Sequence, residues 1–246
     1  MIETFHLVSQ YLAAASISFK SKKDDDSHTN LIWNVESSSL STQSLNDDGI
    51  TMSLSFRSFK LTWNDKTSTK DFDLNGKSHA EILKWIVLMV EASTINKTYQ
   101  YQFHYDLPYS SVENEDIFNA GDAKEVNEII GNLDLAQKEF KEFLAASELE
   151  SDLRVWPHHF DLGGFVLLQN GTGLGFGLGI PDSVSDTPYI YVSGYKGHDP
   201  VSTDSFTELS IGNWQSGSWN GAVLPSIEFS DGAVYSFLQQ AYKSFE

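Results

Sequence analysis

The chain has 246 residues, of which 40% are hydrophobic and 13% aromatic, and it carries a formal net charge of −18 with a sequence pI near 4.6. This composition is typical of a globular protein, and the charge argues against nucleic acid and anionic membrane surfaces as partners because their phosphates would be repelled. The absence of cysteine excludes disulfides, zinc–thiolate sites and thiol nucleophiles.

The sequence shows no targeting or membrane-spanning pattern. Its first residues include Glu3 and lack the basic region of a signal peptide. No apolar run approaches the roughly 20 residues that span a bilayer. We therefore expect a soluble, acidic, cytoplasmic protein without a membrane partner.

The first third of the chain is predicted to be a helix followed by a small antiparallel meander. Apolar residues of the first twenty positions recur at spacings of three and four, which indicates an amphipathic helix. Period-two alternation then predicts short strands, with a turn or bulge where the parity changes near Arg57 and Ser58. These strands lie around residues 31–35, 52–56, 59–63 and 72–74.

A second helix is predicted to begin after Ser78, because Ser78 and Glu81 match a capping box. It is apolar on nearly all sides, so we expect it to be well buried against the meander. A strand is predicted to follow, with four aromatic residues on one face. We interpret them as core, and the alternative is an exposed stacking platform for a sugar or base. The four are Tyr99, Tyr101, Phe103 and Tyr105.

A long helix over residues 122–147, capped by Asp122, separates two β-rich halves. In the second half, strands run between Arg154 and Phe229, with a hairpin turn at Asn170-Gly171, and Asp231 is predicted to cap a final helix. The predicted fold class is therefore α+β, with antiparallel sheets and about four helices. We expect a single compact unit, residues 1–246, that divides into residues 1–110 and 122–246.

Four sequence blocks resemble a bacterial family of uncharacterised proteins that is catalogued as a domain of unknown function. The blocks are WPHHFDLG (156–163), GLGFGLGIPD (173–182), TPYIYVSGY (187–195) and WNGAVLP (219–225). The resemblance extends over most of the chain, is best in its second half, and follows the family's order of blocks. It implies no activity, substrate or cofactor, so it assigns no functional residue.

The WPHHFD block contains the residue types of a metal or acid–base site. If residues 154–161 are extended, His159 and Asp161 lie on one face and the adjacent His158 points away. His159 and Asp161 could then bind a divalent metal with His198 as a further ligand, or Asp161 could orient His159 as a general base. The structural alternative is a strand start at which the histidines make local hydrogen bonds.

The strand that follows has glycine at every second position, from Gly171 to Gly179. The spacing does not match a nucleotide-binding loop, and no other nucleotide-binding motif occurs. A bare strand face indicates close approach of another group. We interpret that group as an aromatic ring, from Trp156 or Trp219, and the alternative is a ligand that lies flat on the strand.

These patterns lead to three hypotheses about function. The first is a small-molecule-binding protein or enzyme with a pocket beside the WPHHFD block, covered in part by the loop between Trp214 and Trp219. The second is a non-catalytic interaction or structural protein with buried, satisfied histidines and an exposed apolar patch. The third is a metal-dependent hydrolase. The candidate ligand-binding residues of the first hypothesis are Trp156, His158, Tyr189, Tyr191 and Trp219.

Overall fold

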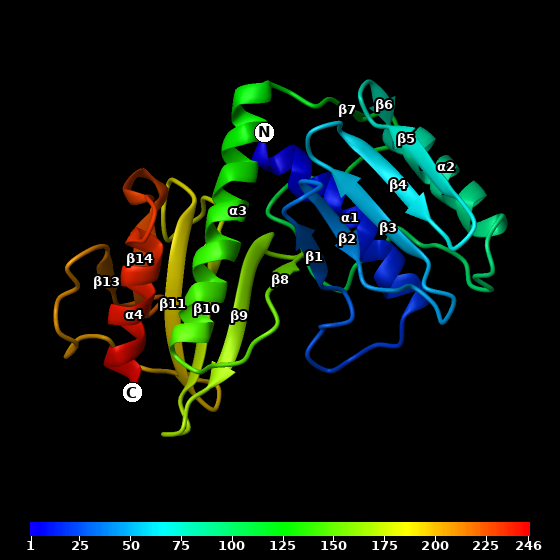
Figure 1. The fold of residues 1–246 in the computed structure, drawn as a ribbon. Helices are drawn as coiled ribbons and strands as arrows, with labels where there is room; N and C mark the ends of the chain where they lie inside the picture. Colours follow the sequence, from blue (N-terminus) through cyan, green and yellow to red (C-terminus); the bar gives the residue numbers. More distant parts are fainter. The chain divides into compact units, whose positions relative to one another are not determined.

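The computed structural model describes all residues from Met1 to Glu246, and the chain divides into two compact units (Figure 1). Unit 1 contains residues 1–130 and 155–159, and unit 2 contains residues 131–154 and 160–246. Four α-helices and exclusively antiparallel strand pairs confirm the α+β class. No helix is both long enough and apolar enough to cross a membrane.

The boundary between the units differs from the predicted division of the chain. It falls inside the long helix α3 (Ala123–Ala146), between Ile130 and Gly131, rather than before that helix. Residues 155–159 then return to unit 1. The cap of α3 is as predicted, because the Asp122 side chain accepts a hydrogen bond from the Lys124 N–H at 2.7 Å.

Unit 1 is a meander with two helices, and its strand order is β8-β1-β2-β3-β4-β5. A separate two-stranded pair is formed by β6 and β7. The elements are α1 (Ile2–Phe19), β1 (Leu31–Asn34), β2 (Ser39–Thr42), β3 (Thr51–Ser55), β4 (Lys60–Asn64), β5 (Thr69–Asp73), β6 (Lys77–Ser78), α2 (His79–Glu91), β7 (Ile117–Phe118) and β8 (Arg154–Trp156).

The core of unit 1 forms where α1 packs on the meander. The ring of Phe5 stacks on Phe56, with centroids 4.2 Å apart, and meets Phe59 edge-on. The predicted parity change is a turn between β3 and β4, in which Phe59 has a φ of +47°. The first helix is therefore correctly predicted, although it is buried on nearly all sides rather than along one stripe.

Two predictions for the middle of unit 1 need correction. The capping box of α2 is present, but Val87 and Leu88 are exposed, so α2 buries one face only. The aromatic segment after it keeps the predicted alternation of buried and exposed positions, yet it pairs with no strand. Residues 99–110 are therefore chain without a strand partner that is held by side chains and bends at 104–105 and 108–109, and we call them the unpaired segment.

Unit 2 is a twisted antiparallel sheet with two helices, and its strand order is β13-β14-β11-β10-β9, with β12 paired to β11. The predicted hairpin at Asn170-Gly171 joins β9 to β10, and Gly171 has a φ of +81°. The elements are the end of α3, β9 (Asp161–Leu167), β10 (Gly173–Gly179), β11 (Tyr189–Lys196), β12 (Asp199–Pro200), β13 (Asn213–Gln215), β14 (Gly221–Pro225), a 3-10 turn (Ser226–Glu228) and α4 (Ala233–Phe245).

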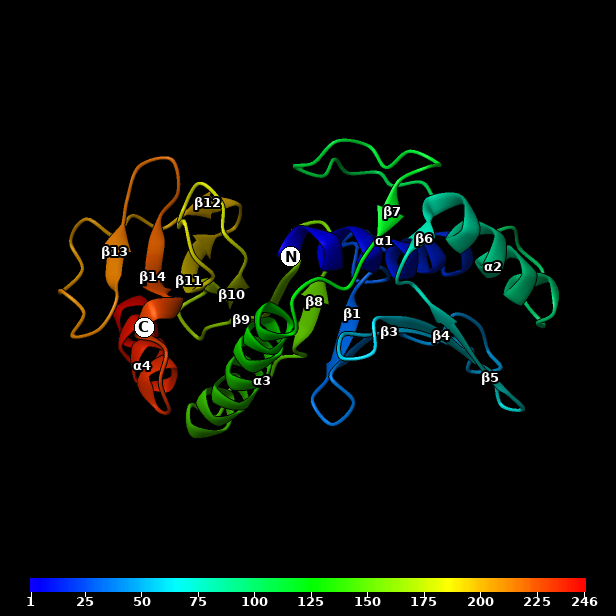
Figure 2. The same ribbon diagram turned by 90° about the horizontal axis from the view of Figure 1, so that it is seen from above.

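Both helices of unit 2 lie on the same face of its sheet (Figure 2). Phe140 and Phe143 of α3 meet the Phe176 ring of β10 edge-on. From α4, the Phe245 ring lies over the bare Cα of Gly194 in β11. Side chains of alternate parity point to the opposite face, which no helix of unit 2 covers. We call it the helix-free face.

The N-terminus of α4 is capped from α3 and not by Asp231 as predicted. The cap position is Gly232, and Asp231 instead forms an ion pair with Lys138 at 3.3 Å. The fully buried carboxylate of Glu139 accepts hydrogen bonds from the N–H groups of Gly232 (3.4 Å) and Tyr235 (3.0 Å). A carboxylate at this end also interacts favourably with the helix dipole, so Glu139 ties α4 to α3.

We expect Glu139→Ala to lower the free energy of unfolding by about 1–3 kcal/mol, because two N–H groups at a buried helix end lose their acceptor. The exposed Glu142 on the same helix is the matched control, and Glu142→Ala should change it by less than about 0.5 kcal/mol. Urea unfolding of both variants measures the difference. Equal effects would contradict the capping role of Glu139.

Candidate functional site

The WPHHFD block forms a turn, so its predicted extended conformation is wrong. Strand β8 ends at Trp156, residues 157–160 form the turn, and β9 begins at Asp161. Phe160 has a φ of +56°, which reverses the chain direction. The rings of His158 and His159 consequently lie close together, with centroids 4.2 Å apart, rather than on opposite faces.

The turn is anchored on α1 by two buried hydrogen bonds to one carbonyl group. The carbonyl oxygen of Pro157 accepts from His6 Nε2 and from Gln10 Nε2, both at 2.8 Å. Because a carbonyl only accepts, His6 Nε2 carries a proton and donates it to Pro157, and His6 Nδ1 lies 3.2 Å from the Tyr109 hydroxyl. Sequence inspection missed His6 and Gln10, whose only signal was polar side chains one turn apart on an apolar helix.

The two histidines of the turn differ in environment. His158 is half-buried against the rings of Trp156 and Tyr105, whereas His159 is exposed. Burial and the neighbouring His159 lower the pKa of His158 to about 4. Burial likewise lowers the pKa of His6 to about 4, although its bond to Pro157 opposes the shift. His6 and His158 are therefore neutral at pH 7, which agrees with a structural role for both side chains.

Asp161, the carboxylate of the predicted pair, belongs to unit 2 and has different partners from those predicted. It lies on the helix-free face, where its Oδ2 accepts from the Tyr191 hydroxyl at 2.5 Å. This hydrogen bond links β11 to β9, because the Tyr191 side chain of β11 reaches across β10. Tyr189 donates in the same way to Asp182 at 2.9 Å. Burial and the adjacent Asp161 raise the pKa of Tyr191 well above its usual value.

The glycines of β10 allow these tyrosine rings to lie against the sheet. A Cβ on Gly177 would lie 2.7 Å from the Tyr191 hydroxyl, and one on Gly179 would lie 2.9 Å from the Tyr189 ring. The ring of Phe165 covers Gly173 in the same manner. An aromatic covering was predicted, but the rings are not those of Trp156 or Trp219. Neighbouring strands supply them.

One glycine on the helix-free face has no ring above it. A Cβ on Gly175 would meet only the Ser193 hydroxyl, at an ordinary 3.5 Å. Beside it on β9, Phe165 is 57% exposed and Leu167 is 72% exposed. The face therefore combines bare backbone with exposed apolar side chains. The one basic residue of β9, β10 and β11, Lys196, has the parity of the opposite face.

The remaining predicted residues do not join these groups into one metal or catalytic site. His198 is exposed in the turn between β11 and β12. Trp219 lies over Gly221, while Trp214 packs against Phe206 and Phe245. No three histidine or carboxylate side chains gather with metal-binding geometry. A metal bound by His159, Asp161 and His198 therefore stays a prediction.

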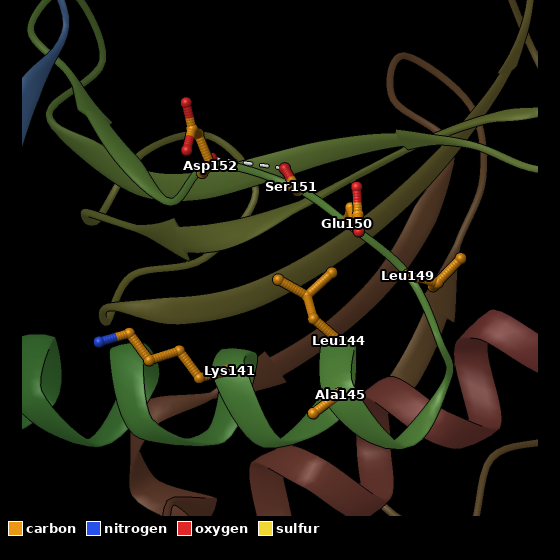
Figure 3. Close-up of a pocket in the computed structure, with 7 residues that line it drawn as sticks. All are labelled: Lys141, Leu144, Ala145, Leu149, Glu150, Ser151 and Asp152. Carbon is orange, nitrogen blue, oxygen red and sulfur yellow. Dashed lines mark hydrogen bonds between the residues drawn. The ribbon is translucent and has the colours of Figure 1, made fainter.

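A groove of unit 2, about 590 Å³ in volume, contains none of the predicted residues (Figure 3). It lies between the end of α3 and the chain that follows, and it is open to solvent. Figure 3 shows that the Lys141 amine points away from the carboxylates of Glu150 and Asp152. Its polar groups do not converge, so the groove has no catalytic arrangement. Its lining residues are Lys141, Leu144, Ala145, Leu149, Glu150, Ser151 and Asp152.

We expect Gly163→Ala and Gly175→Ala to have opposite effects on stability. A Cβ on Gly163 would lie 2.4 Å from the Phe176 carbonyl oxygen, so backbone must shift at a cost of about 1–3 kcal/mol. At Gly175 the space is open, and alanine should stabilise the strand by about 0.5–1 kcal/mol. Thermal unfolding compares them. A destabilised Gly175→Ala variant would show that this position is covered.

Stability should fall as the pH is lowered from about 6.5 to about 4. The pKa values of His6 and His158 are lowered to about 4 in the folded protein, whereas unfolded histidine titrates near 6.5. The unfolded chain therefore binds more protons in this window, which favours unfolding. Urea unfolding at several pH values measures the free energy of unfolding, and His6→Gln should reduce its loss between about pH 6.5 and pH 4. The exposed His198 is the control, and His198→Gln should leave it unchanged.

Comparisons with models of protein families, with curated proteins and with solved structures give no match. The resemblance of the WPHHFD and WNGAVLP blocks to a bacterial family therefore stays a prediction. The chemistry of the candidate site rests on the geometry of the two units alone. That geometry consists of a histidine-anchored turn in unit 1 and an aromatic, acidic sheet face in unit 2.

Proposed function

We propose that this chain is a non-catalytic interaction protein that binds a basic protein partner through the helix-free face of unit 2. The observation that carries the proposal is the exposure of Phe165 and Leu167 on a sheet face where β10 has glycine at every second position. Exposed apolar side chains grouped on one face are typical of protein interaction sites. The bare backbone at Gly175 beside them allows a partner to approach closely.

Charge indicates the chemistry of the partner. Unit 2 contains 15 aspartate and glutamate residues against 5 lysine and arginine residues, a net charge of −10. Asp161 and Asp182 lie beside the tyrosines of the face, and Lys196, the one basic residue of β9, β10 and β11, has the parity of the opposite face. A partner with lysine, arginine and aromatic side chains would be attracted by this field.

The histidine cluster supports a structural role for the WPHHFD turn. His6 and His79 are buried and hydrogen-bonded, to Pro157 and Tyr11 respectively. Buried, hydrogen-bonded histidines around the turn and exposed apolar side chains in unit 2 support the interaction hypothesis, although His159 itself is exposed. We propose a cytoplasmic setting for this interaction, as the composition predicts.

A display library of random short peptides tests the proposal. We expect wild-type protein to select peptides rich in basic and aromatic residues, with binding that weakens as salt increases. The double variant Phe165→Ser and Leu167→Ser should lose this class. Ile227, which is 89% exposed elsewhere in unit 2, is the matched control, and Ile227→Ser should keep it. Selection that survives the double variant would contradict the proposal.

Small-molecule binding is a second candidate, favoured by the short Tyr191–Asp161 hydrogen bond beside open Gly175. A planar hydroxylated ligand could stack beside Phe165 and compete for this carboxylate. Thermal-shift screening with sugars and aromatic compounds tests it. A compound that raises the melting temperature of the wild-type protein should not raise that of the Gly175→Leu variant, because the leucine side chain fills the open position. Equal stabilisation of both proteins would place the compound elsewhere.

A further inference from the structure

Helix α2 of unit 1 is more apolar than its burial explains. Nine of its 13 residues are apolar, yet Ile82, Ile86 and Val90 are the only buried ones among them. Val87 is 39% exposed and Leu88 is 49% exposed. A helix that is apolar on all sides is normally buried on all sides. The fold of unit 1 therefore leaves one side of α2 without the covering that its sequence predicts.

The uncovered side of α2, which we call the outer face, carries two charges placed symmetrically about an apolar centre. Residues three and four positions apart share one face of a helix. The outer face therefore contains Lys84, Val87, Leu88 and Glu91, all of which are exposed. Lys84 comes three residues before Val87, and Glu91 comes three residues after Leu88. Each charge thus lies about 5 Å along the helix axis from the midpoint between the two apolar residues.

The two charges of the outer face form no ion pair within the protein. Lys84 and Glu91 are two helical turns apart, about 10 Å along the axis, so they do not reach each other. Neither forms an ion pair with another residue. The nearer carboxylate, Glu81, already binds Lys77 and the Ser78 N–H, each at 3.0 Å. Figure 2 shows α2 at the edge of unit 1, with no helix or strand of this unit beyond it.

We infer that the outer face binds the same face of a second copy of this chain, with the two α2 helices antiparallel about a two-fold axis through that midpoint. Such a contact uses one surface twice. The antiparallel orientation places Lys84 of each copy opposite Glu91 of the other, and Val87 opposite Leu88. A parallel orientation would place like charges opposite each other, so the charges select the antiparallel pair. The site lies in unit 1 and does not depend on the helix-free face.

Burial of the apolar centre drives this association, and the two ion pairs determine its orientation. Of the three charged side chains of α2 beyond its first residue, Glu81 is already paired, so the outer face itself is neutral although the chain has a net charge of −18. An interface one helix wide is small for a stable dimer. We therefore expect a dimer that dissociates on dilution.

Charge exchange on the outer face tests the inference by sedimentation equilibrium of the full chain, from about 1 μM to about 1 mM protein. We expect Lys84→Glu and Glu91→Lys each to weaken dimerisation at least about tenfold, because like charges then face each other. The double variant, which carries both substitutions, should return to within about threefold of the wild type. Both positions are exposed, and circular dichroism confirms that each variant folds.

A mixture of the two single variants tests the antiparallel geometry directly. The Lys84→Glu protein has two acidic groups on its outer face, and the Glu91→Lys protein has two basic groups. Each should be monomeric alone under conditions in which the wild type is dimeric. An equimolar mixture should form a heterodimer, because every charge then faces an opposite charge. A mixture that stays monomeric would overturn the inference.

Apolar substitutions separate this surface from the others. Val87→Ser with Leu88→Ser should abolish the dimer, whereas Ile117→Ser, at a position 60% exposed elsewhere in unit 1, should keep it. The Phe165→Ser and Leu167→Ser variant should dimerise like the wild type, so failure of this contact and failure of the helix-free face are distinguishable. A wild-type protein that is monomeric at about 1 mM would contradict the inference. So would a dimer that both charge variants retain.

Discussion

The two hydrogen bonds that converge on the Pro157 carbonyl fix the turn between β8 and β9 on α1, where the chain passes from unit 1 to unit 2. They bring residues 155–159 back to α1, so that the turn joins the core of unit 1. The same chain leaves the turn at Phe160 and starts β9 of unit 2. A motif whose adjacent residues look like one site in the sequence is therefore divided between two packing environments. Half-buried His158 and exposed His159 belong to unit 1, and Asp161 belongs to unit 2.

Unit 2 depends on a different constraint, the absence of side chains along β10. Bare Cα atoms let Tyr189, Tyr191 and Phe165 lie against the sheet instead of standing away from it. Aromatic rings then cover the helix-free face of the sheet, and helices cover the opposite face. A flat surface of rings and glycine, with tyrosine hydroxyls bound to carboxylates, is suited to recognition and lacks an enclosed pocket. This is the physical basis of the proposed interaction role.

The two proposed surfaces select different partners. The helix-free face offers apolar area in an acidic field, whereas the outer face of α2 offers apolar area between one lysine and one glutamate. The first would attract a basic protein, and the second is complementary to itself. A dimer formed through α2 would present two helix-free faces, so a partner with two binding segments would gain avidity.

Local chemistry made much of the fold predictable. The capping box at Ser78, the cap at Asp122 and the Asn170-Gly171 turn are set by neighbours in sequence, and the structure confirms each. The cap of α4 was not predictable, because its carboxylate comes from Glu139, far away in the chain. For the same reason, neighbouring positions such as His159 and Asp161 can belong to different units of the fold.

The sequence by itself determined the α+β class, the order of the four helices, and the alternation of residues 99–105, since these follow from periodicity and capping. Only the tertiary structure decided that this alternating segment lacks a strand partner, that the WPHHFD block turns, and which rings cover the glycines. Each of those outcomes depends on contacts between residues distant in the chain. Local propensity does not specify such contacts, because their energy arises only when separate elements pack together.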